Sequence, residues 1–403
     1  MEQVIEGHAI PDHVPPGLVH DFDLHRDPTL DHDLHEGYIG LHRAAPPLFY
    51  TFRNGGHWIA TGSDVVREMM LSPKIFSSTG IAVPAPPPEL AVPFPPLDMD
   101  DPEHRKIRAL LNKFLAPSVV RRMENTIRNY ARELISDILA QGNSCEYIEQ
   151  FSSRLPVGIW MAIMNMDFSR RREIIGWVHV IVGHYSMGDR AKVMEALYAY
   201  QGQLADERAV NPGDDPISFL LNAEVDGQRL SRQMVLDISN LLFTAGLDTV
   251  TNALTFLTRF LAENPGHQQQ LRDDPAKIPQ AIEEMLRRFS FVLTGRRVME
   301  DVVLGGVQLR KGDHVLGALP SASNDPGQWP DPMTVDFDRD ARGHFAFNTG
   351  PHACAGIHLA RLELKICLEE WLAAIPNFRT APGYVAAVRK SQTMGIDNLD
   401  LVW

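Results

Sequence analysis

The chain has 403 residues, with 38 Lys and Arg against 51 Asp and Glu, and so a formal charge of −13. This balance argues against nucleic acid as a partner, because a phosphate-binding surface needs clustered basic residues. Three cysteines cannot build a disulfide framework in so long a chain, and their odd number favours a reducing cytosol. The sequence has neither an apolar run of about 18 residues nor a basic start before an apolar segment, so it predicts no membrane span and no signal peptide.

The N-terminal segment is rich in histidine, since eight of the sixteen histidines precede residue 58. Metal ligands usually come in tight pairs within defined turns, whereas these histidines are scattered among prolines and aspartates. Metal binding is therefore the weaker interpretation. Residues 48–52 and 57–61, separated by an Asn-Gly-Gly turn, predict a β-hairpin.

Between Pro84 and Pro96 lie seven prolines in 13 residues, which excludes a regular helix. The composition alone fits a linker between domains or a lid over a pocket equally well. Short strands are predicted at 301–304 and 307–309. Helical periodicity is found in seven segments, at 102–115, 118–141, 152–164, 169–184, 190–209, 231–263 and 275–289. The fold class predicted is mainly α with small β-sheets.

The most informative segment is FNTGPHACAG, from Phe347 to Gly356. Cys354 lies just before a helical pattern that starts at Ile357, and the free N–H groups and dipole of a helix N-terminus favour a thiolate. Gly350 and Gly356 permit a tight turn and the close approach of a bulky partner to the sulfur. Such a thiolate can bind iron, although the loop alone also fits a buried, inert cysteine.

The predicted helix 231–263 carries a polar pair on the same face as apolar residues. Leu241, Ala245 and the pair Asp248 and Thr249 share that face by their i, i+4, i+7/8 spacing. A carboxylate beside a hydroxyl is a poor choice for a helix that only packs. The Thr249 hydroxyl can bond to the Ala245 carbonyl and open the helix locally, which would leave room for a small ligand and a path for protons. The alternative is a packed helix with a polar notch.

The cysteine segment has the pattern Phe-x-x-Gly-x-His-x-Cys-x-Gly, which resembles the haem-binding loop of the cytochrome P450 family. Asp248 and Thr249 resemble the acid–alcohol pair of that family's distal helix. The similarity covers residues 98–403, roughly three quarters of the chain, and is closest to the bacterial camphor hydroxylases. It implies one triangular, mainly helical domain over residues 1–403, with most of the β structure in the N-terminal third. The linker interpretation of the proline segment is thereby demoted.

The resemblance also implies the site residues. Haem b would lie between Cys354, the metal ligand, and the 231–263 helix, where Asp248 and Thr249 are the catalytic pair. The implied cofactor-binding residues are His104, Arg108, Ala245, Arg296, Phe347, Gly350, His352 and Gly356. A structural trio, Glu284, Arg287 and Arg339, would support the haem loop. The implied substrate pocket comprises Val83, Val92, Phe94, Leu241, Thr244, Val292, Gln392 and Thr393.

The activity implied is a monooxygenase reaction, in which dioxygen and two electrons lead to oxygen insertion into a C–H bond. The electrons would come from a [2Fe–2S] ferredoxin, itself reduced by an FAD-containing, NADH-dependent reductase. The expected docking rim is basic and comprises Arg105, Lys106, Arg108, Arg339, Arg342, Arg361 and Lys365. The camphor branch pairs its distal acid with a distant base, but 178–186 offers only His179 and His184. Asp248 is therefore expected to be freer here.

The substrate expected is a compact, hydrocarbon-like molecule, because the implied pocket is almost wholly apolar. The camphor branch holds its ketone with a tyrosine, whereas no tyrosine lies between Tyr50 and Tyr130 here and Val92 takes the corresponding position. A buried ketone without a donor loses affinity, so an ionone-like terpenoid or norisoprenoid is expected instead of camphor. A weak polar anchor is expected from Thr244, Gln392 or Thr393.

Two other functions stay open. A haem-thiolate peroxygenase would use hydrogen peroxide directly, but family members of that kind usually lack the acid–alcohol pair. A non-catalytic haem or terpenoid sensor would need neither this pair nor the basic rim.

Overall fold

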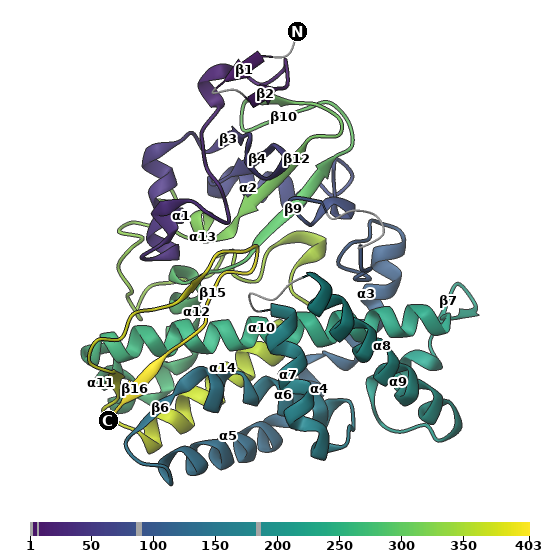
Figure 1. Cartoon of the computed structure of the whole chain (residues 1–403), viewed down its shortest axis with the longest axis vertical. Coiled ribbons are helices and arrows are strands. Elements are labelled where there is room, and N and C mark those ends of the chain that lie inside the picture. Colours follow the sequence, from purple (N-terminus) through teal and green to yellow (C-terminus); the bar gives the residue numbers. More distant parts are fainter. Residues whose placement is uncertain (1–2, 6–7, 86–90, 183–186) are drawn as a thin grey trace.

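The computed structural model describes residues 3–5, 8–85, 91–182 and 187–403 (Figure 1). Part of the proline segment, 86–90, lies outside these residues, and so the choice between a lid and a linker is not tested over that stretch. His184 and the side chain of His179 also lie outside them.

Helices make up most of the described chain, and all seven predicted helical segments fall on them, with 118–141 divided into two helices. The helices are α1 (Leu34–Ala44), α2 (Ser63–Leu71), α3 (Glu103–Phe114), α4 (Pro117–Val120), α5 (Glu124–Leu139), α6 (Arg154–Ile163), α7 (Arg171–Val182), α8 (Met187–Val210), α9 (Pro216–Leu221), α10 (Arg232–Glu263), α11 (Pro265–Asp273), α12 (Ile278–Arg288), α13 (Leu319–Ala322) and α14 (Ile357–Ala374).

The largest sheet has five strands in the order β3 (Leu48–Thr51), β4 (His57–Ala60), β12 (His314–Ala318), β9 (Leu293–Val298) and β5 (Phe76–Ser77). The predicted hairpin is confirmed, because β3 and β4 pair antiparallel. β4 also pairs in parallel with β12, and β12 pairs antiparallel with β9. The interior of the sheet thus joins segments from the two ends of the chain.

Smaller sheets lie around this core, and the predicted strands near Gly305 are confirmed. They are β1 (Gln3–Ile5) with β2 (His8–Ile10), β10 (Val302–Leu304) with β11 (Val307–Leu309), β7 (Glu224–Val225) with β8 (Gln228–Arg229), β14 (Val388–Arg389) with β15 (Gly395–Ile396), and the sheet β13 (Arg379–Thr380), β16 (Asp400–Val402) and β6 (Ser144–Glu146). The expectation that the N-terminal third holds most of the β structure is wrong for the described residues, since β9, β12 and the C-terminal hairpins lie beyond it. The N-terminal strand β4 pairs with β12, and β6 pairs with β16, so segments late in the chain supply much of the β structure.

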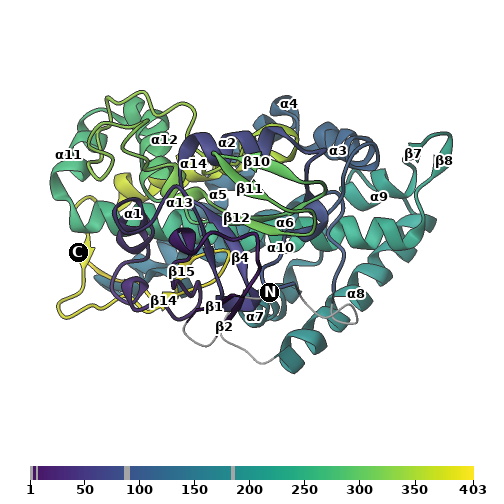
Figure 2. The same ribbon diagram turned by 90° about the horizontal axis from the view of Figure 1, so that it is seen from above.

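α10 crosses the middle of the molecule, with the largest sheet above it and α5, α6 and α14 below it in Figure 1. In Figure 2, which is viewed from above, β12 overlaps α10, in agreement with that arrangement. The Ser231 hydroxyl caps the helix by accepting the Met234 N–H at 3.1 Å, and Pro265 follows its end. Most of α10 is buried between α6, α8 and α14, so it forms a fixed wall for whatever lies beside it.

Candidate active site

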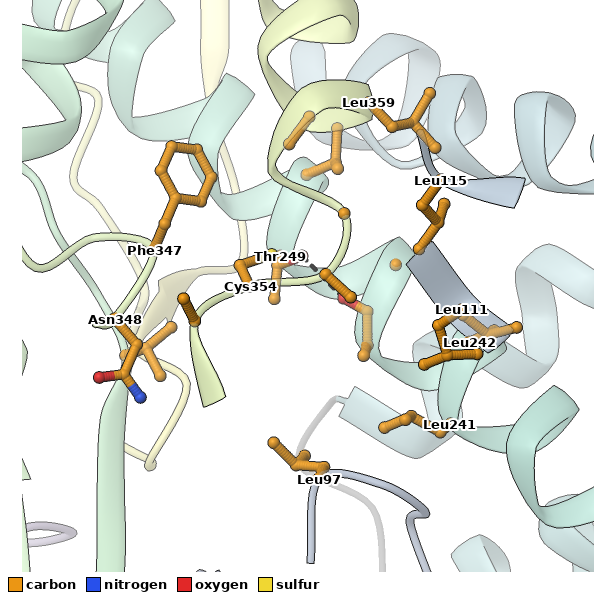
Figure 3. A pocket seen from close by; sticks show the side chains of 18 of the residues that line it. Leu97, Leu111, Leu115, Leu241, Leu242, Thr249, Phe347, Asn348, Cys354 and Leu359 are labelled. Atoms are coloured by element: carbon orange, nitrogen blue, oxygen red, sulfur yellow. Dashed lines mark hydrogen bonds between the residues drawn. The ribbon is translucent and has the colours of Figure 1, made fainter. Parts of the chain in front are cut away.

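A cavity of about 320 Å³ lies between α10 and the loop that precedes α14. Cys354 and Thr249 both line it, and Figure 3 shows leucines from α3, α10, α14 and the segment before α3 around them. The labelled apolar residues are Leu97, Leu111, Leu115, Leu241, Leu242, Phe347 and Leu359. The cavity therefore combines a thiol and a hydroxyl within a largely apolar wall.

The cysteine loop is held by short-range contacts. The backbone N–H of Cys354 donates to the Phe347 carbonyl at 2.9 Å, and α14 begins at Ile357, as predicted. Gly350 has a φ of 73°, and a Cβ there would lie 2.6 Å from the Met70 carbonyl oxygen. The positive φ agrees with the predicted tight turn, and the close packing of α2 also requires a glycine here. Gly356 does line the cavity, and a Cβ there would meet nothing within 4 Å.

The Cys354 thiol is exposed to the cavity although it lies deep in the protein. That depth raises the pKa of the thiol, while the Gly356 N–H and the cations Arg108 and Arg361 lower it in part. A metal ion that replaced the proton would remove the cost of burying this group. The sulfur is thus placed to bind a metal that enters from the cavity.

The α10 side carries the predicted polar contact. The Thr249 hydroxyl donates to the Ala245 carbonyl at 2.8 Å, yet α10 is helical throughout, so the expected local opening is not observed. Ala245 and Gly246 are exposed where they line the cavity. Because the hydroxyl proton is used inside the helix, the Thr249 oxygen is left to accept a hydrogen bond from a guest.

Asp248 is not free, which corrects the expectation drawn from 178–186. Its Oδ1 accepts a hydrogen bond from Arg389 Nη2 at 3.0 Å, and both side chains are at most a tenth exposed. Burial raises the pKa of the Asp248 carboxyl, and the charge of Arg389 acts in the opposite direction. Sequence reasoning missed Arg389, because it lies in β14, 141 residues further along the chain, and no local pattern links it to α10.

The structure brings the three residues of the predicted structural trio together, with Glu284 and Arg287 buried and Arg339 partly exposed. Arg287 Nε donates to Glu284 Oε2 at 2.7 Å, and both side chains are fully buried. Arg339 Nε donates to the other Glu284 oxygen at 3.1 Å, and Arg287 also bonds the Pro332 carbonyl at 3.0 Å. These contacts fasten α12 to the segment that leads into the cysteine loop.

The comparisons with known proteins agree with this geometry. The family model described as Cytochrome P450 matches residues 190–381. A "Probable cytochrome P450 127A1" of Sinorhizobium fredii is 34% identical over 99% of this chain and 98% of its own. The chain belongs to the cytochrome P450 family. A "Methyl-branched lipid omega-hydroxylase" of Mycobacterium tuberculosis is 31% identical, over 93% of this chain and 92% of that protein.

Solved P450 structures superpose on almost the whole chain. The structure of CYP101J2 has a TM-score of 0.89 at 33% identity, and covers 98% of this chain and 99% of its own. That of CYP101C1 has a TM-score of 0.90 at 31% identity, with the same shares covered. The fold is thus the mainly helical P450 fold, and the chain is a haem-dependent monooxygenase of the bacterial type.

The cations around the cavity fit a haem, which brings two propionates into the fold. Arg296 is buried, burial lowers its pKa to about 10, and within the described residues it forms no ion pair. Its Nη1 donates to Thr294 Oγ1 at 3.0 Å and to the Gly295 carbonyl at 2.7 Å. A buried guanidinium without a carboxylate is costly, and a propionate would supply the missing anion.

Three further predicted propionate contacts line the same cavity, namely His104, Arg108 and His352. The rings of His104 and His352 stack with centroids 3.9 Å apart. Burial lowers the pKa of both imidazoles, in His352 to about 3, so both are neutral near pH 7. His352 Nε2 lies 3.0 Å from Ser78 Oγ. Arg108 and Arg296 both act to lower the pKa of His352, so the four predicted propionate contacts lie close together, although Arg296 itself does not line the cavity.

Of the eight residues predicted for the substrate pocket, Leu241 and Val292 line the cavity, whereas Val83, Val92, Phe94, Thr244, Gln392 and Thr393 do not. Val83 is packed in the hydrophobic core, and the Thr244 hydroxyl donates to the Asn240 carbonyl at 2.6 Å. The Gln392 amide is fully used, because it donates to the Ile81 carbonyl and accepts the Val83 N–H. Leu97, Leu242 and Phe291 were missed and take their place.

Other predicted features have mixed outcomes. Most of the expected basic rim is neutralised within the chain, since Lys106 pairs with Asp226, Arg342 with Asp340, Arg361 with Glu283, and Lys365 with Glu369.

Across the part of the chain that the structure describes, no three His, Cys, Asp or Glu side chains gather as metal ligands. Within the same residues, every helix is too short or too polar to cross a bilayer.

Proposed function

We propose that this P450 hydroxylates a compact, apolar molecule of the terpenoid or norisoprenoid kind, with ionone-like compounds as the first candidates. The observation that carries the proposal is the composition of the cavity above Thr249, where Leu97, Leu241, Leu242 and Val292 offer no side-chain donor. An apolar wall binds a guest by burying its apolar surface. Ionones and camphor each carry one ketone that these four side chains leave unpaired, so we rank ionones above camphor on the larger hydrocarbon surface that they bury.

When bound, haem supplies the iron at which dioxygen is reduced and one oxygen atom is passed to substrate. We propose that Cys354 holds the iron, and that Arg108, Arg296, His104 and His352 hold the propionates. Phe347 fixes the cysteine backbone through its carbonyl. At rest, the Thr249 oxygen accepts a hydrogen bond from the guest. To deliver a proton, the Thr249 hydroxyl leaves the Ala245 carbonyl and donates to the guest, and Asp248, its neighbour in α10, replaces that proton.

Substrate class is tested by the spin-state shift of the ferric protein on titration with a panel of ligands. Ionones and related terpenoids are expected to give the tightest binding, and camphor weaker binding. A methyl-branched fatty acid belongs in the panel because of the mycobacterial relative's name. Tight camphor binding with weak ionone binding would contradict the proposal.

Electrons are proposed to come from a separate [2Fe–2S] ferredoxin with its FAD reductase and NADH, in the cytoplasm. An iron–sulfur cluster is usually held by four cysteines. This chain has three, of which Cys145 and Cys367 are buried and Cys354 faces the cavity, so it lacks the ligands for a cluster of its own. Reconstitution with a ferredoxin and reductase is expected to give product that depends on NADH.

The peroxygenase alternative is disfavoured by the Asp248–Thr249 pair and by the buried base that supports the acid. Turnover with hydrogen peroxide but none with ferredoxin would reverse that judgement. NADH-coupled product formation would exclude the sensor alternative.

A further inference from the structure

A buried cluster at the C-terminal hairpin meets the distal acid. Arg389 ends β14, and its Nη2 donates to Asp248 Oδ1 at 3.0 Å and to Asn252 Oδ1 at 3.1 Å. Its Nε donates to Asp397 Oδ1 at 3.0 Å. A buried guanidinium is stable only when carboxylates and polar groups surround it in this way, so the cluster defines one position for the Asp248 side chain.

The backbone opposite Arg389 is shaped around the guanidinium. Gly395 pairs with Arg389 across β14 and β15. A Cβ at 395 would lie 2.5 Å from Arg389 Nη2 and 2.7 Å from Asn252 Oδ1. Because carbon cannot approach these atoms so closely, any larger residue at 395 would push the guanidinium away from Asp248. The volume beside Asp248 is thus reserved for the arginine.

Asp248 meets two charged groups of opposite sign within the described residues. Arg389 attracts its carboxylate, whereas Asp397 repels it across the guanidinium. Burial also favours the protonated acid. Removing the guanidinium would leave burial and Asp397, which favour protonation, opposed by the hydrogen bond from Asn252.

The hairpin and the cavity wall are also continuous. The Leu293 N–H donates to the Gln392 carbonyl at 2.7 Å, and the Met394 N–H donates to the Phe291 carbonyl at 2.8 Å. Phe291 and Val292 line the cavity. The element that carries Arg389 is therefore anchored to the wall of the cavity.

We propose that Arg389 is the positioning residue of the distal acid, holding the Asp248 carboxylate behind Thr249 and keeping it ionised until it takes up a proton. The inference rests on the proton role proposed for Asp248. Thr249 lines the cavity and Asp248 does not, so the acid acts through Thr249 and Arg389 acts through the acid.

The test compares Arg389→Gln and Arg389→Lys with Lys390→Gln in the ferric holoenzyme. Lys390 is a matched control, because it lies on the same hairpin with the same charge, but bonds to Asp31 and to the Asp27 carbonyl. The readout is the pH midpoint of the Asp248 carboxyl infrared band, identified by its loss in Asp248→Asn. Arg389→Gln is expected to raise the midpoint by about 1–3 pH units. Arg389→Lys keeps the charge, so its midpoint should lie close to that of the wild type, and Lys390→Gln should leave the midpoint unchanged.

Gly395→Ala is a second variant that keeps the charge and displaces it, and it is expected to raise the midpoint in the same direction. If Arg389→Gln does not fold, Arg389→Lys and Gly395→Ala carry the test. An unchanged midpoint in the folded Arg389 and Gly395 variants would overturn the proposal.

The product formed per NADH distinguishes the positioning role of Arg389 from the proton role of Asp248, on which it rests. Asp248→Asn is expected to lower the product formed per NADH many-fold, because loss of the proton donor slows the productive step by about 100-fold, and Arg389→Gln is expected to lower it in the same direction with substrate binding retained. If product per NADH falls in Asp248→Asn but stays at the wild-type level in Arg389→Gln, the positioning role of Arg389 is overturned and the proton role of Asp248 stands. Full coupling in Asp248→Asn would overturn the proton role itself, and the positioning role with it.

Discussion

The two sides of the cavity are assembled in different ways. On the cysteine side, Cys354 bonds to Phe347 within one loop, and α14 starts directly after that loop. On the α10 side, Asp248 is completed by Arg389 from a hairpin 141 residues away. A contiguous motif thus defines the first side, whereas the packing of distant segments defines the second.

This difference predicts how each side responds to mutation. A change in the cysteine loop removes a group that no other part of the chain replaces. A change on the α10 side alters a network shared by a helix and a hairpin, so its effect is graded and the conservative variant can restore it. The predictions below test that contrast.

The largest effect is expected from Cys354→Ala. Loss of the thiolate should abolish the thiolate-shifted Soret band of the reduced carbon monoxide complex, and product formation with it. Cys367→Ala is the matched control, since that thiol is buried in α14 away from the cavity. A retained band in Cys354→Ala would mean that the iron ligand lies elsewhere.

Glu284→Gln tests the support of the cysteine side. It breaks a fully buried pair with Arg287, so we expect a loss of about 3–5 kcal/mol in the free energy of unfolding. The adjacent Glu283→Gln removes a partly exposed pair with Arg361 and should cost less than Glu284→Gln, because solvent screens part of that attraction. Denaturant unfolding of the two variants measures both, and equal losses would contradict the structural role of the trio.

Thr249→Ala tests the α10 side. Haem and substrate binding should be retained, because the hydroxyl bonds only within its own helix, while product per NADH falls several-fold and hydrogen peroxide rises. Thr251→Ala is a suitable control, since its hydroxyl makes the same kind of bond to the Leu247 carbonyl but Thr251 is not among the cavity residues. Unchanged coupling in Thr249→Ala would remove the role proposed for that hydroxyl.

The contrast also explains what could be predicted from sequence. Helix periods, the 48–61 hairpin, the Cys354 loop and the Thr249–Ala245 bond depend on residues close in the chain, and the structure contains them. The same holds for the first pair of the trio, Glu284 with Arg287. Each is a pattern that a single segment specifies.

The features that sequence missed depend on tertiary packing. Arg389 lies in a hairpin with no local sign of its partner in α10. Gln392 was expected in the pocket, but its amide satisfies backbone groups of residues 81 and 83, far from it in the chain. The demand that α2 makes on Gly350 was missed for the same reason, because the contacting atom, the Met70 carbonyl oxygen, lies far away in the chain.

A smaller, pH-dependent effect is expected at Glu283. Burial raises the pKa of this carboxyl, but His344 and Arg361 lower it more, to about 2. Because the folded pKa lies below the unfolded value of about 4.3, the group stabilises the fold above that value and loses this contribution as the pH falls toward 2. The stability difference between the wild type and Glu283→Gln should therefore shrink between about pH 5 and pH 2, measured by thermal unfolding, and a constant difference would contradict the pairing.

The smallest effect is expected from salt on reduction by the ferredoxin. Most bases of the expected docking rim already pair with carboxylates of the chain, so raised ionic strength should slow reduction by no more than about tenfold, the low end of electrostatic steering. Arg105 is 74% exposed and lies 3.8 Å from Asp101, whereas Arg342 is held by Asp340 at 2.5 Å. Arg105→Gln should therefore weaken the salt dependence of the stopped-flow reduction rate more than Arg342→Gln does. The reverse order would show that internal pairing does not decide which bases the ferredoxin meets.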